Sequence, residues 1–296
     1  SGNYRRSCIM SNEPRFLVVD GYLKKSRDEL AAGGAEVAGD LYGAMLKKAS
    51  PGSSFDIIYP CDAVSVLPSG EALSGYDGIA WTGCSLTVFD DIPEVRAQIE
   101  FARACFKGGI PAFGSCWAAQ IAVVVAGGAC AANPKGREMG IARKITLTPE
   151  GRAHPLYEGK SDVFDAFISH DDVITTLPGG AVRLSGNAFS HVQSVSVDFN
   201  GGTFWGLQYH PEYDLHEMAR LTWCRIDKMI GLGFFPNREA GEAHVDMLEA
   251  LSKDPDNKDI AWRLGINDDV MDQEFRQTET RNWIKHLVLP TMAERR

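Results

Sequence analysis

Short apolar runs alternate with segments of helical character through about the first 130 residues, and this alternation restricts the fold more than any other feature. The runs that we expect to form strands lie at 16–19, 55–59, 78–81 and 110–113. Helical segments lie between them, at 35–48 and from Pro93 onward. Strands that alternate with helices predict βαβ units, and therefore an open, mostly parallel α/β sheet with helices on both faces. Ligands bind such sheets at the carboxyl ends of the strands.

The second half of the chain has a different pattern. Further strand candidates, joined by Gly, Pro and Asn turns, predict antiparallel hairpins at 142–147, 164–168, 181–185, 194–199 and 203–209. Residues 215–230 are helical again, and the sequence beyond 234 becomes polar. We therefore expect an N-terminal tail at 1–14, one α/β domain at 15–233 and a helical C-terminal extension at 234–296.

Apolar clusters in the extension favour helices that dock onto the α/β domain or onto a second copy of the chain. The residues at helical spacing are Met247, Leu248 and Leu251, and then Trp283, Ile284 and Leu287, with Trp262 in between. Helices this short bury such stripes against a neighbour or are unstable alone. A disordered acidic tail is the alternative, but disordered segments carry fewer apolar residues than this.

Charge and cysteine content exclude several kinds of partner. A formal net charge of −9 and a pI near 5.3 argue against nucleic acid and against an anionic membrane, since both require clustered Lys and Arg. Seven cysteines without a C-x-x-C pair form no disulfide pattern, so we expect reduced thiols in the cytoplasm. The polar residues 1–15 lack the apolar stretch of a signal peptide, and no His or Cys spacing resembles a metal cluster. A small-molecule substrate fits these properties best.

One cysteine occupies a position typical of a catalytic nucleophile. The expected strand at 110–113 leads directly into Gly114 and Cys116, and a helix is expected to begin at Trp117. A sharp strand-to-helix turn exposes the side chain at its apex, while the helix N-terminus stabilises a thiolate and leaves N–H groups free for an oxyanion. Gln120 lies one helical turn further on, on the same face. An inert, buried cysteine is the alternative for an isolated Gly-x-Cys.

A base and its orienting carboxylate follow a later strand. The expected strand at 203–209 ends in His210, Pro211 and Glu212. The proline favours an extended conformation at His210, so His210 and Glu212 project to one side. A carboxylate there can hold one ring nitrogen and leave the other as a proton acceptor, as in a Cys-His-Glu triad. The same three residues, taken alone, are also typical of a helix start.

These segments resemble the two signatures of the class I glutamine amidotransferases. Residues 111–120 read PAFGSCWAAQ and residues 206–212 read GLQYHPE. Residues 76–84, YDGIAWTGC, are similar to the family's strand and oxyanion loop. Residues 169–173, SHDDV, resemble its substrate loop in the GMP synthetase branch. The resemblance covers about 16–230, and the motifs together are far more specific than any one of them.

The resemblance implies a flavodoxin-like fold and cysteine-dependent hydrolysis of a γ-glutamyl amide, through a thioester, without metal or cofactor. Cys116 would attack the amide, His210 would carry the proton to the departing ammonia or amine, and Glu212 would orient His210. The oxyanion hole would consist of the backbone N–H groups of Cys84 and Trp117. The residues that would hold the glutamyl end of the substrate are Gly83, Gln120, Ser169, Asp171 and Asp172.

Three features depart from the family pattern. Ala118 and Cys84 stand where the family has glycine, which affects the geometry of the loops rather than the chemistry. No ATP-pyrophosphatase motif of a synthetase is present, so an ammonia acceptor would be a separate protein or absent.

Alternative functions remain open on these residues. A stand-alone γ-glutamyl peptidase or amidase uses the same triad as a glutaminase that serves a synthetase. The charged segment 21–34, taken as a loop at the active-site edge, favours a substrate larger than glutamine, although an ordinary solvated loop is as good an interpretation. A non-catalytic regulatory module is the alternative from another class, and the intact Cys-His-Glu set argues against it. Self-association of the chain, if it occurs, is expected through the C-terminal helices.

Overall fold

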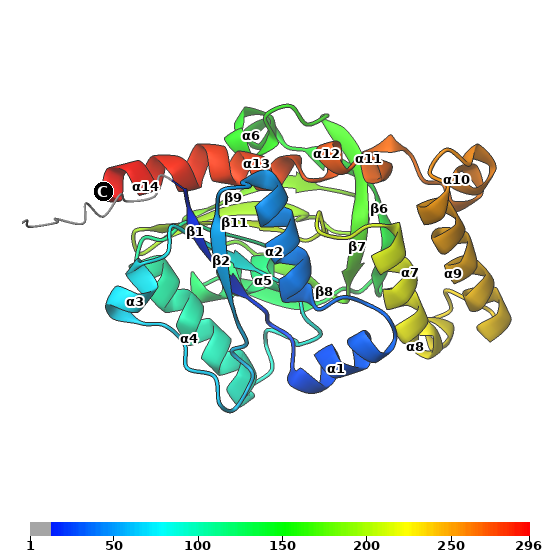
Figure 1. The fold of residues 1–296 in the computed structure, drawn as a ribbon, viewed down its shortest axis with the longest axis horizontal. Helices are drawn as coiled ribbons and strands as arrows, with labels where there is room; N and C mark the ends of the chain where they lie inside the picture. The colour runs from blue at the N-terminus through cyan, green and yellow to red at the C-terminus, as the bar shows by residue number, and fades with distance from the viewer. Residues whose placement is uncertain (1–12) are drawn as a thin grey trace, which may run out of the picture.

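The computed structural model describes residues 13–296, so that most of the predicted tail at 1–14 lies outside the described residues (Figure 1). Its centre is a nine-stranded sheet in the order β2-β1-β3-β4-β11-β10-β9-β6-β7. The parallel strands are β2 (Ser54–Ile58), β1 (Arg15–Val19), β3 (Gly78–Trp81), β4 (Ala112–Ser115) and β11 (Gly202–Leu207). The antiparallel ones are β10 (Ser194–Phe199), β9 (Ala181–Gly186), β6 (Glu138–Leu147) and β7 (Val163–His170). The predicted α/β sheet with antiparallel hairpin additions is confirmed.

Helices cover both faces of the parallel part. The helices α4 (Pro93–Lys107) and α5 (Trp117–Val125) pack on one face, and α2 (Ala38–Ala49) and α13 (Thr278–Trp283) pack on the other. Successive side chains of β1 point to opposite faces of the sheet. Leu17 packs in the core beneath α4 and α5, whereas Phe16 packs in the core beneath α2. A strand buried on both sides is apolar throughout, which is why the first strand shows no alternation of polar and apolar residues.

Shorter elements complete the α/β part. The helices are α1 (Lys24–Ala32), α3 (Gly70–Ser74), α6 (Pro149–Ala153), the 3₁₀ turn η1 (Pro155–Tyr157), α7 (Leu215–Cys224) and α8 (Ile226–Gly231). A second, two-stranded sheet pairs β5 (Ala129–Ala132) with β8 (Asp172–Thr176).

The structure corrects two details of the sequence-based prediction. The segment 21–34 is not a loop, because most of it forms α1, in which Arg27 is the buried residue. Its polar sequence offers no apolar stripe, and the helix is supported instead by ion pairs such as Lys24 with Asp28 one turn apart. The strand expected at 110–113 lies two residues later, because Gly114 and Ser115 still pair with β11.

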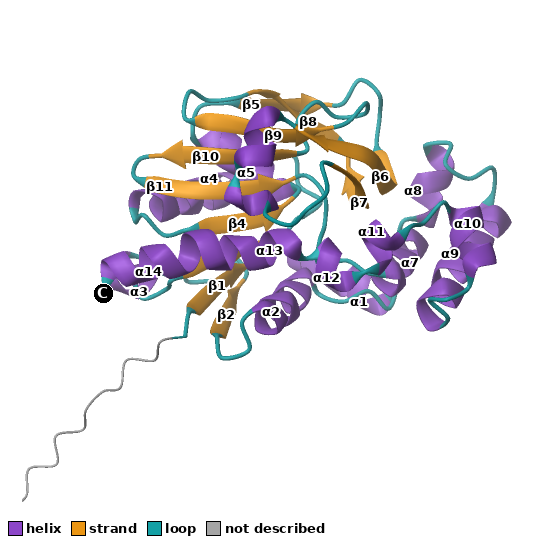
Figure 2. Ribbon diagram, turned by 90° about the horizontal axis from the view of Figure 1, so that it is seen from above, coloured by secondary structure: helices purple, strands orange, loops and turns teal. Residues whose placement is uncertain are grey.

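The C-terminal extension consists of helices in two groups. Besides α13, they are α9 (Arg238–Lys253), α10 (Lys258–Leu264), α11 (Asp268–Met271), α12 (Gln273–Arg276), the π-helical turn η2 (Ile284–Val288) and α14 (Leu289–Arg295). Figure 2 shows α9 and α10 at one end of the molecule beside α7, whereas α13 and α14 run along the sheet toward the opposite end. Leu248 and Leu251 of α9 are buried in a cluster with α7.

Two tryptophans of the extension have opposite environments. Trp283 is fully buried, with its ring 5.5 Å from that of Phe113 and 5.6 Å from that of Phe16. Trp262 is 83% exposed, so its expected contribution to docking is wrong. The division of the chain at residue 233 stays a prediction, but the place of Trp283 in the main core makes α13 part of the α/β layer. Self-association through these helices also stays a prediction.

Within residues 13–296, none of the helices combines the length and the apolar character needed to cross a bilayer.

The contrast between the two tryptophans gives a stability prediction. Replacing Trp283 by Ala opens a cavity between α13 and the sheet, and we expect it to lower the free energy of unfolding by about 3–5 kcal/mol. The matched change Trp262→Ala removes an exposed ring, and we expect a change within about 0.5 kcal/mol. Urea denaturation of both variants measures this difference, and equal losses would contradict the packing described for α13.

Candidate active site

Parallel pairing between β4 and β11 brings two distant segments together. Four pairs, from Phe204 with Ala112 to Leu207 with Ser115, fix the register of the two strands. Cys116 follows the last residue of β4, and His210 lies three residues beyond the end of β11. Both therefore lie at the carboxyl edge of the parallel sheet, where such sheets place their ligand sites.

Cys116 lies on a strained turn between β4 and α5. Its φ of 53° and ψ of −102° fall in a region that residues other than glycine rarely adopt. Its own N–H donates to the carbonyl oxygen of Leu207 at 2.6 Å, which ties the turn to β11. A Cβ on Gly114 would lie 2.2 Å from the Trp81 carbonyl oxygen and 2.4 Å from the Cβ of Ala118. The missing side chain of Gly114 thus leaves the room that the methyl group of Ala118 requires.

His210 is held by Glu212 and leaves one nitrogen unused. Its Nδ1 lies 2.7 Å from Oε1 of Glu212, and the Ser115 hydroxyl donates to the other carboxylate oxygen at 3.0 Å. The ring stacks on Tyr213 with centroids 4.2 Å apart. The buried Nε2 has no hydrogen-bond partner within residues 13–296. A buried nitrogen without a partner is costly, so an unused Nε2 beside a cysteine indicates a position kept for a reacting group.

The surroundings of His210 favour its protonated form. Burial lowers the pKa of His210, but the negative charge of Glu212 and the contacts with Cys116 and Glu212 outweigh burial and raise it to about 9. At neutral pH the ring is therefore an imidazolium, which can donate a proton to a leaving group.

The segment after β3 lies against both side chains. A Cβ on Gly83 would lie 2.9 Å from Cε1 of His210 and 3.4 Å from Cβ of Cys116, so only glycine fits there without displacement. Among the described residues, the backbone N–H groups of Cys84 and Trp117 have no hydrogen-bond acceptor. Burial raises the pKa of the Cys84 thiol well above its ordinary value, so this second cysteine of the cleft stays protonated.

A polar cleft of about 80 Å³ opens beside Cys116 and His210. Four of the predicted substrate residues line it, namely Gln120, Ser169, Asp171 and Asp172. Gln120 donates to the carbonyl oxygen of Asp172 at 3.2 Å. The Asp172 carboxylate has no hydrogen bond or ion pair among the described residues, and burial together with the charge of Asp171 raises its pKa.

Sequence reasoning missed the basic side of this cleft. Arg137 lies 2.6 Å from the Asp171 carboxylate, and Lys228 lies 3.1 Å from it. Arg137 and Arg225 both donate to the Ser169 hydroxyl, at 2.6 and 3.0 Å. Arg137 precedes β6, Lys228 lies on α8 and Arg225 at the α7–α8 junction, and no local motif marks them. Tyr22 also lines the cleft. Its position just after β1, at the carboxyl edge of the sheet, could have identified it as a site residue from the sequence.

A buried contact between His170 and Glu138 supports the Ser169–Asp172 segment. His170 places Nδ1 2.7 Å from the carbonyl oxygen of Asp172 and Nε2 2.8 Å from Glu138. Hydrogen bonds from His170, Asn187 and Gln193 lower the pKa of Glu138 despite its burial, so Glu138 is an anion. Both ring nitrogens of His170 thus face oxygen atoms. His170 thereby holds the Asp172 backbone to which Gln120 also binds.

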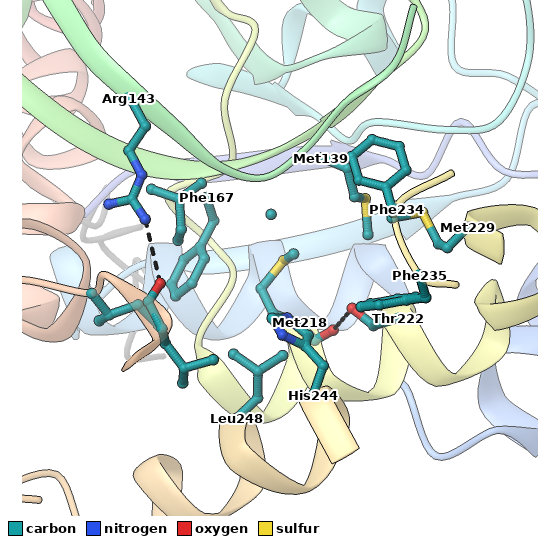
Figure 3. A pocket seen from close by; sticks show the side chains of 14 residues that line it. Met139, Arg143, Phe167, Met218, Thr222, Met229, Phe234, Phe235, His244 and Leu248 are labelled. Atoms are coloured by element: carbon teal, nitrogen blue, oxygen red, sulfur yellow. Dashed lines mark hydrogen bonds between the residues drawn. The ribbon is translucent and has the colours of Figure 1, made fainter. Parts of the chain in front are cut away.

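A larger cavity elsewhere is a poorer candidate for chemistry. Figure 3 shows this space of about 340 Å³, which Met139, Phe167, Met218, Phe234 and other mainly apolar side chains line. Its lining residues include no cysteine, serine or carboxylate, and burial lowers the pKa of the histidine among them, His244.

Comparisons with known proteins identify a family and several relatives of this chain. The family model described as glutamine amidotransferase class-I matches residues 65–222. The γ-glutamyl-L-1-hydroxyisopropylamide hydrolase of a Pseudomonas species is 31% identical over 286 residues, which cover 94% of each chain. The glutamine-hydrolyzing GMP synthase of Porphyromonas gingivalis is 32% identical over 159 residues, 53% of this chain but only 29% of that enzyme.

Two solved structures share the fold. A glutamine amidotransferase from Thermotoga maritima superposes with a TM-score of 0.65 at 16% identity, over 93% of this chain and 98% of that one. One from Methylobacillus flagellatus gives a TM-score of 0.60 at 20% identity, over 93% and 95% of the two chains. On the family match and the full-length relative, this chain belongs to the glutamine amidotransferase class-I family.

Proposed function

We propose that this protein hydrolyses the γ-glutamyl amide bond of a small substrate, with Cys116 as nucleophile, His210 as proton carrier and Glu212 as the group that orients His210. The observation that carries the proposal is the pairing of a strained Cys116 turn with a buried His210 Nε2 that has no partner in the described part of the chain. An inert structural cysteine would account for neither feature.

The proposed reaction has two halves. The Cys116 thiolate attacks the amide carbon, and the carbonyl electrons move to an oxyanion that the N–H groups of Cys84 and Trp117 stabilise. Collapse of this intermediate forms the thioester and expels the amine, which takes its proton from the His210 imidazolium. Neutral His210 then removes a proton from water, which cleaves the thioester to glutamate and restores the thiolate. Each oxyanion donor is expected to lower the barrier by about 3 kcal/mol.

Charges in the cleft match the glutamyl end of such a substrate. The unpaired Asp172 carboxylate suits an α-ammonium group, while Arg137 and Lys228 supply positive charge for an α-carboxylate. Asp171 is already occupied by those two cations, so its part in the proposal is to position them. Gln120 and Ser169 complete the polar wall, and Gly83 leaves the scissile carbonyl the space that it needs.

We favour a free-standing hydrolase of substituted γ-glutamyl amides over a glutaminase that serves a synthetase. The relative that supports this choice is the γ-glutamyl-L-1-hydroxyisopropylamide hydrolase, whose similarity covers 94% of both chains. The second candidate is a glutaminase that delivers ammonia to a separate synthetase. The support for this candidate is a subunit of the glutamine-hydrolyzing GMP synthase of Methanoculleus marisnigri. That subunit is 27% identical to this chain, over 49% of this chain and 74% of its own length.

Substitution of the nucleophile tests the proposal. Cys116→Ala should abolish release of glutamate from γ-glutamyl amides while the fold is retained, because only a small buried sulfur is lost. Cys105→Ala is the matched control, since that thiol lies on the buried side of α4 and does not line the cleft, and we expect this variant to remain active. Coupled glutamate assays with circular dichroism as a folding check measure both, and an active Cys116→Ala enzyme would rule out the triad.

The two partners of Cys116 should differ in their effect. We expect Glu212→Gln to reduce kcat less than His210→Ala, because an amide oxygen can still accept from Nδ1 whereas nothing replaces the proton carrier. Steady-state rates under saturating substrate give the ranking, and the opposite order would require new roles for both residues.

The pH profile should reveal how Glu212 acts on His210. Because the pKa of His210 is raised to about 9, kcat/KM should fall as the pH rises through that value and the imidazolium is lost. Glu212→Gln removes the charge that raises this pKa, so the alkaline fall should move to lower pH. An alkaline limb at the same pH in both enzymes would contradict the assignment.

A further inference from the structure

A second, larger cavity adjoins the catalytic cleft. This cavity of about 390 Å³ lies between α1 and the α7–α8 junction, and Ser85 and Arg225 line both spaces. Ser26, Glu29 and Leu30 form its α1 side, and Trp223 and Asp227 contribute to the other. We call this cavity the α1 groove. Its volume falls within the range of small-molecule sites, which the cleft alone does not reach.

The two ends of the cleft have different chemistry. The end near Gln120 and Asp172 carries the groups suited to the amino acid portion of a substrate. Tyr213 stacks on His210, and Arg225 joins this part of the cleft to the glutamyl end, because it donates to the Tyr22 hydroxyl at 3.3 Å and to the Ser169 hydroxyl at 3.0 Å. His210 protonates the departing amine in the proposed reaction, and a substituent on that amine that passes Arg225 enters the α1 groove.

We infer that the α1 groove receives the amine substituent of the substrate, an inference that rests on the proposed hydrolase function. Ammonia released from glutamine needs no such space. A γ-glutamyl amide with a short carbon chain on nitrogen would extend past Ser85 and Arg225 and contact α1.

The charges of the groove specify the kind of substituent. Arg225 already donates hydrogen bonds to the hydroxyls of Ser169 and Tyr22, and Arg238 lies 2.9 Å from the Asp227 carboxylate. Glu29, in contrast, has only a loose ion pair with Lys25, at 3.8 Å. The charge without a close partner in the groove is therefore negative, on a side chain that is 66% exposed, beside the apolar Leu30 and Trp223. A short aliphatic amine that ends in a hydroxyl or ammonium group fits this lining, and one that ends in a carboxylate does not.

Rates on four substrates test the wild-type enzyme: glutamine, γ-glutamylethanolamide, the γ-glutamyl amide of 1,4-diaminobutane, and γ-glutamylglycine. We expect kcat/KM for the hydroxyl- and ammonium-ended amides to exceed that for glutamine and for γ-glutamylglycine by about fivefold or more. Faster hydrolysis of glutamine than of every substituted amide would overturn the inference and leave the proposed function standing. Hydrolysis of none of the four would overturn both.

Charge reversal on α1 provides a matched pair of variants. Glu29→Arg should lower the ratio of kcat/KM for the diamine amide to that for γ-glutamylglycine by about fivefold or more, since a cation then favours the carboxylate. Asp28→Arg makes the same charge change on an exposed residue that does not line the groove, and its ratio should match the wild type. Leu30→Trp fills the groove and should lower kcat/KM for both substituted amides relative to glutamine. Unchanged ratios in Glu29→Arg and Leu30→Trp, in an enzyme that hydrolyses γ-glutamyl amides, would overturn the inference alone.

Discussion

The parallel pairing of β4 with β11 is the constraint on which the rest of the site depends. Cys116 and His210 are 94 positions apart in the sequence, and they meet because four residue pairs lock these strands in one register. The hydrogen bond from the Cys116 N–H to Leu207 extends the same pairing into the turn. A shift of one residue would reverse the faces of β11 and carry the segment with His210 away from the cysteine. Both flanking helical layers contribute to holding this register, because each buries one face of the two strands.

The turn that carries Glu212 is held by hydrogen bonds from other elements. Tyr42 hydrogen-bonds to the Ser115 hydroxyl, which in turn donates to Glu212. Gln277 donates to the Pro211 carbonyl oxygen at 3.4 Å, so the C-terminal extension reaches the same turn. Nearby, the Tyr209 hydroxyl donates to Glu279 at 2.6 Å, and Glu279 lies 3.1 Å from Lys160 in a fully buried ion pair. The extension therefore supports the site rather than forming an independent unit, which agrees with the burial of Trp283.

The elbow and the His-Pro-Glu turn were predictable from the sequence because each is a local pattern. A strand, a Gly-x-Cys and a helix follow one another without interruption, and the parallel sheet then brings Cys116, His210 and Glu212 to one edge; their catalytic roles remain a proposal. The cationic side of the cleft was not predictable. Arg137 and Arg225 meet at Ser169 only through tertiary packing, and nothing in their neighbouring residues marks them.

Other elements escaped prediction for equally physical reasons. The helix α1 has a polar sequence with no apolar stripe, and β5 is built largely of alanine, which has little preference for strands. Both tryptophans of the extension are large apolar residues in helical segments, but only Trp283 is buried, because only its helix packs against the sheet. Helical spacing of apolar residues predicts an apolar face but does not identify the element that covers it.

Acid quenching of the enzyme during turnover, followed by peptide mass spectrometry, tests the central claim most directly. With a γ-glutamyl amide as substrate, the account predicts a γ-glutamyl thioester on the peptide that contains Cys116, present during turnover and absent once the substrate is exhausted. Turnover that leaves Cys116 unmodified while another residue carries the γ-glutamyl group, or that proceeds equally with Cys116 alkylated, would contradict it.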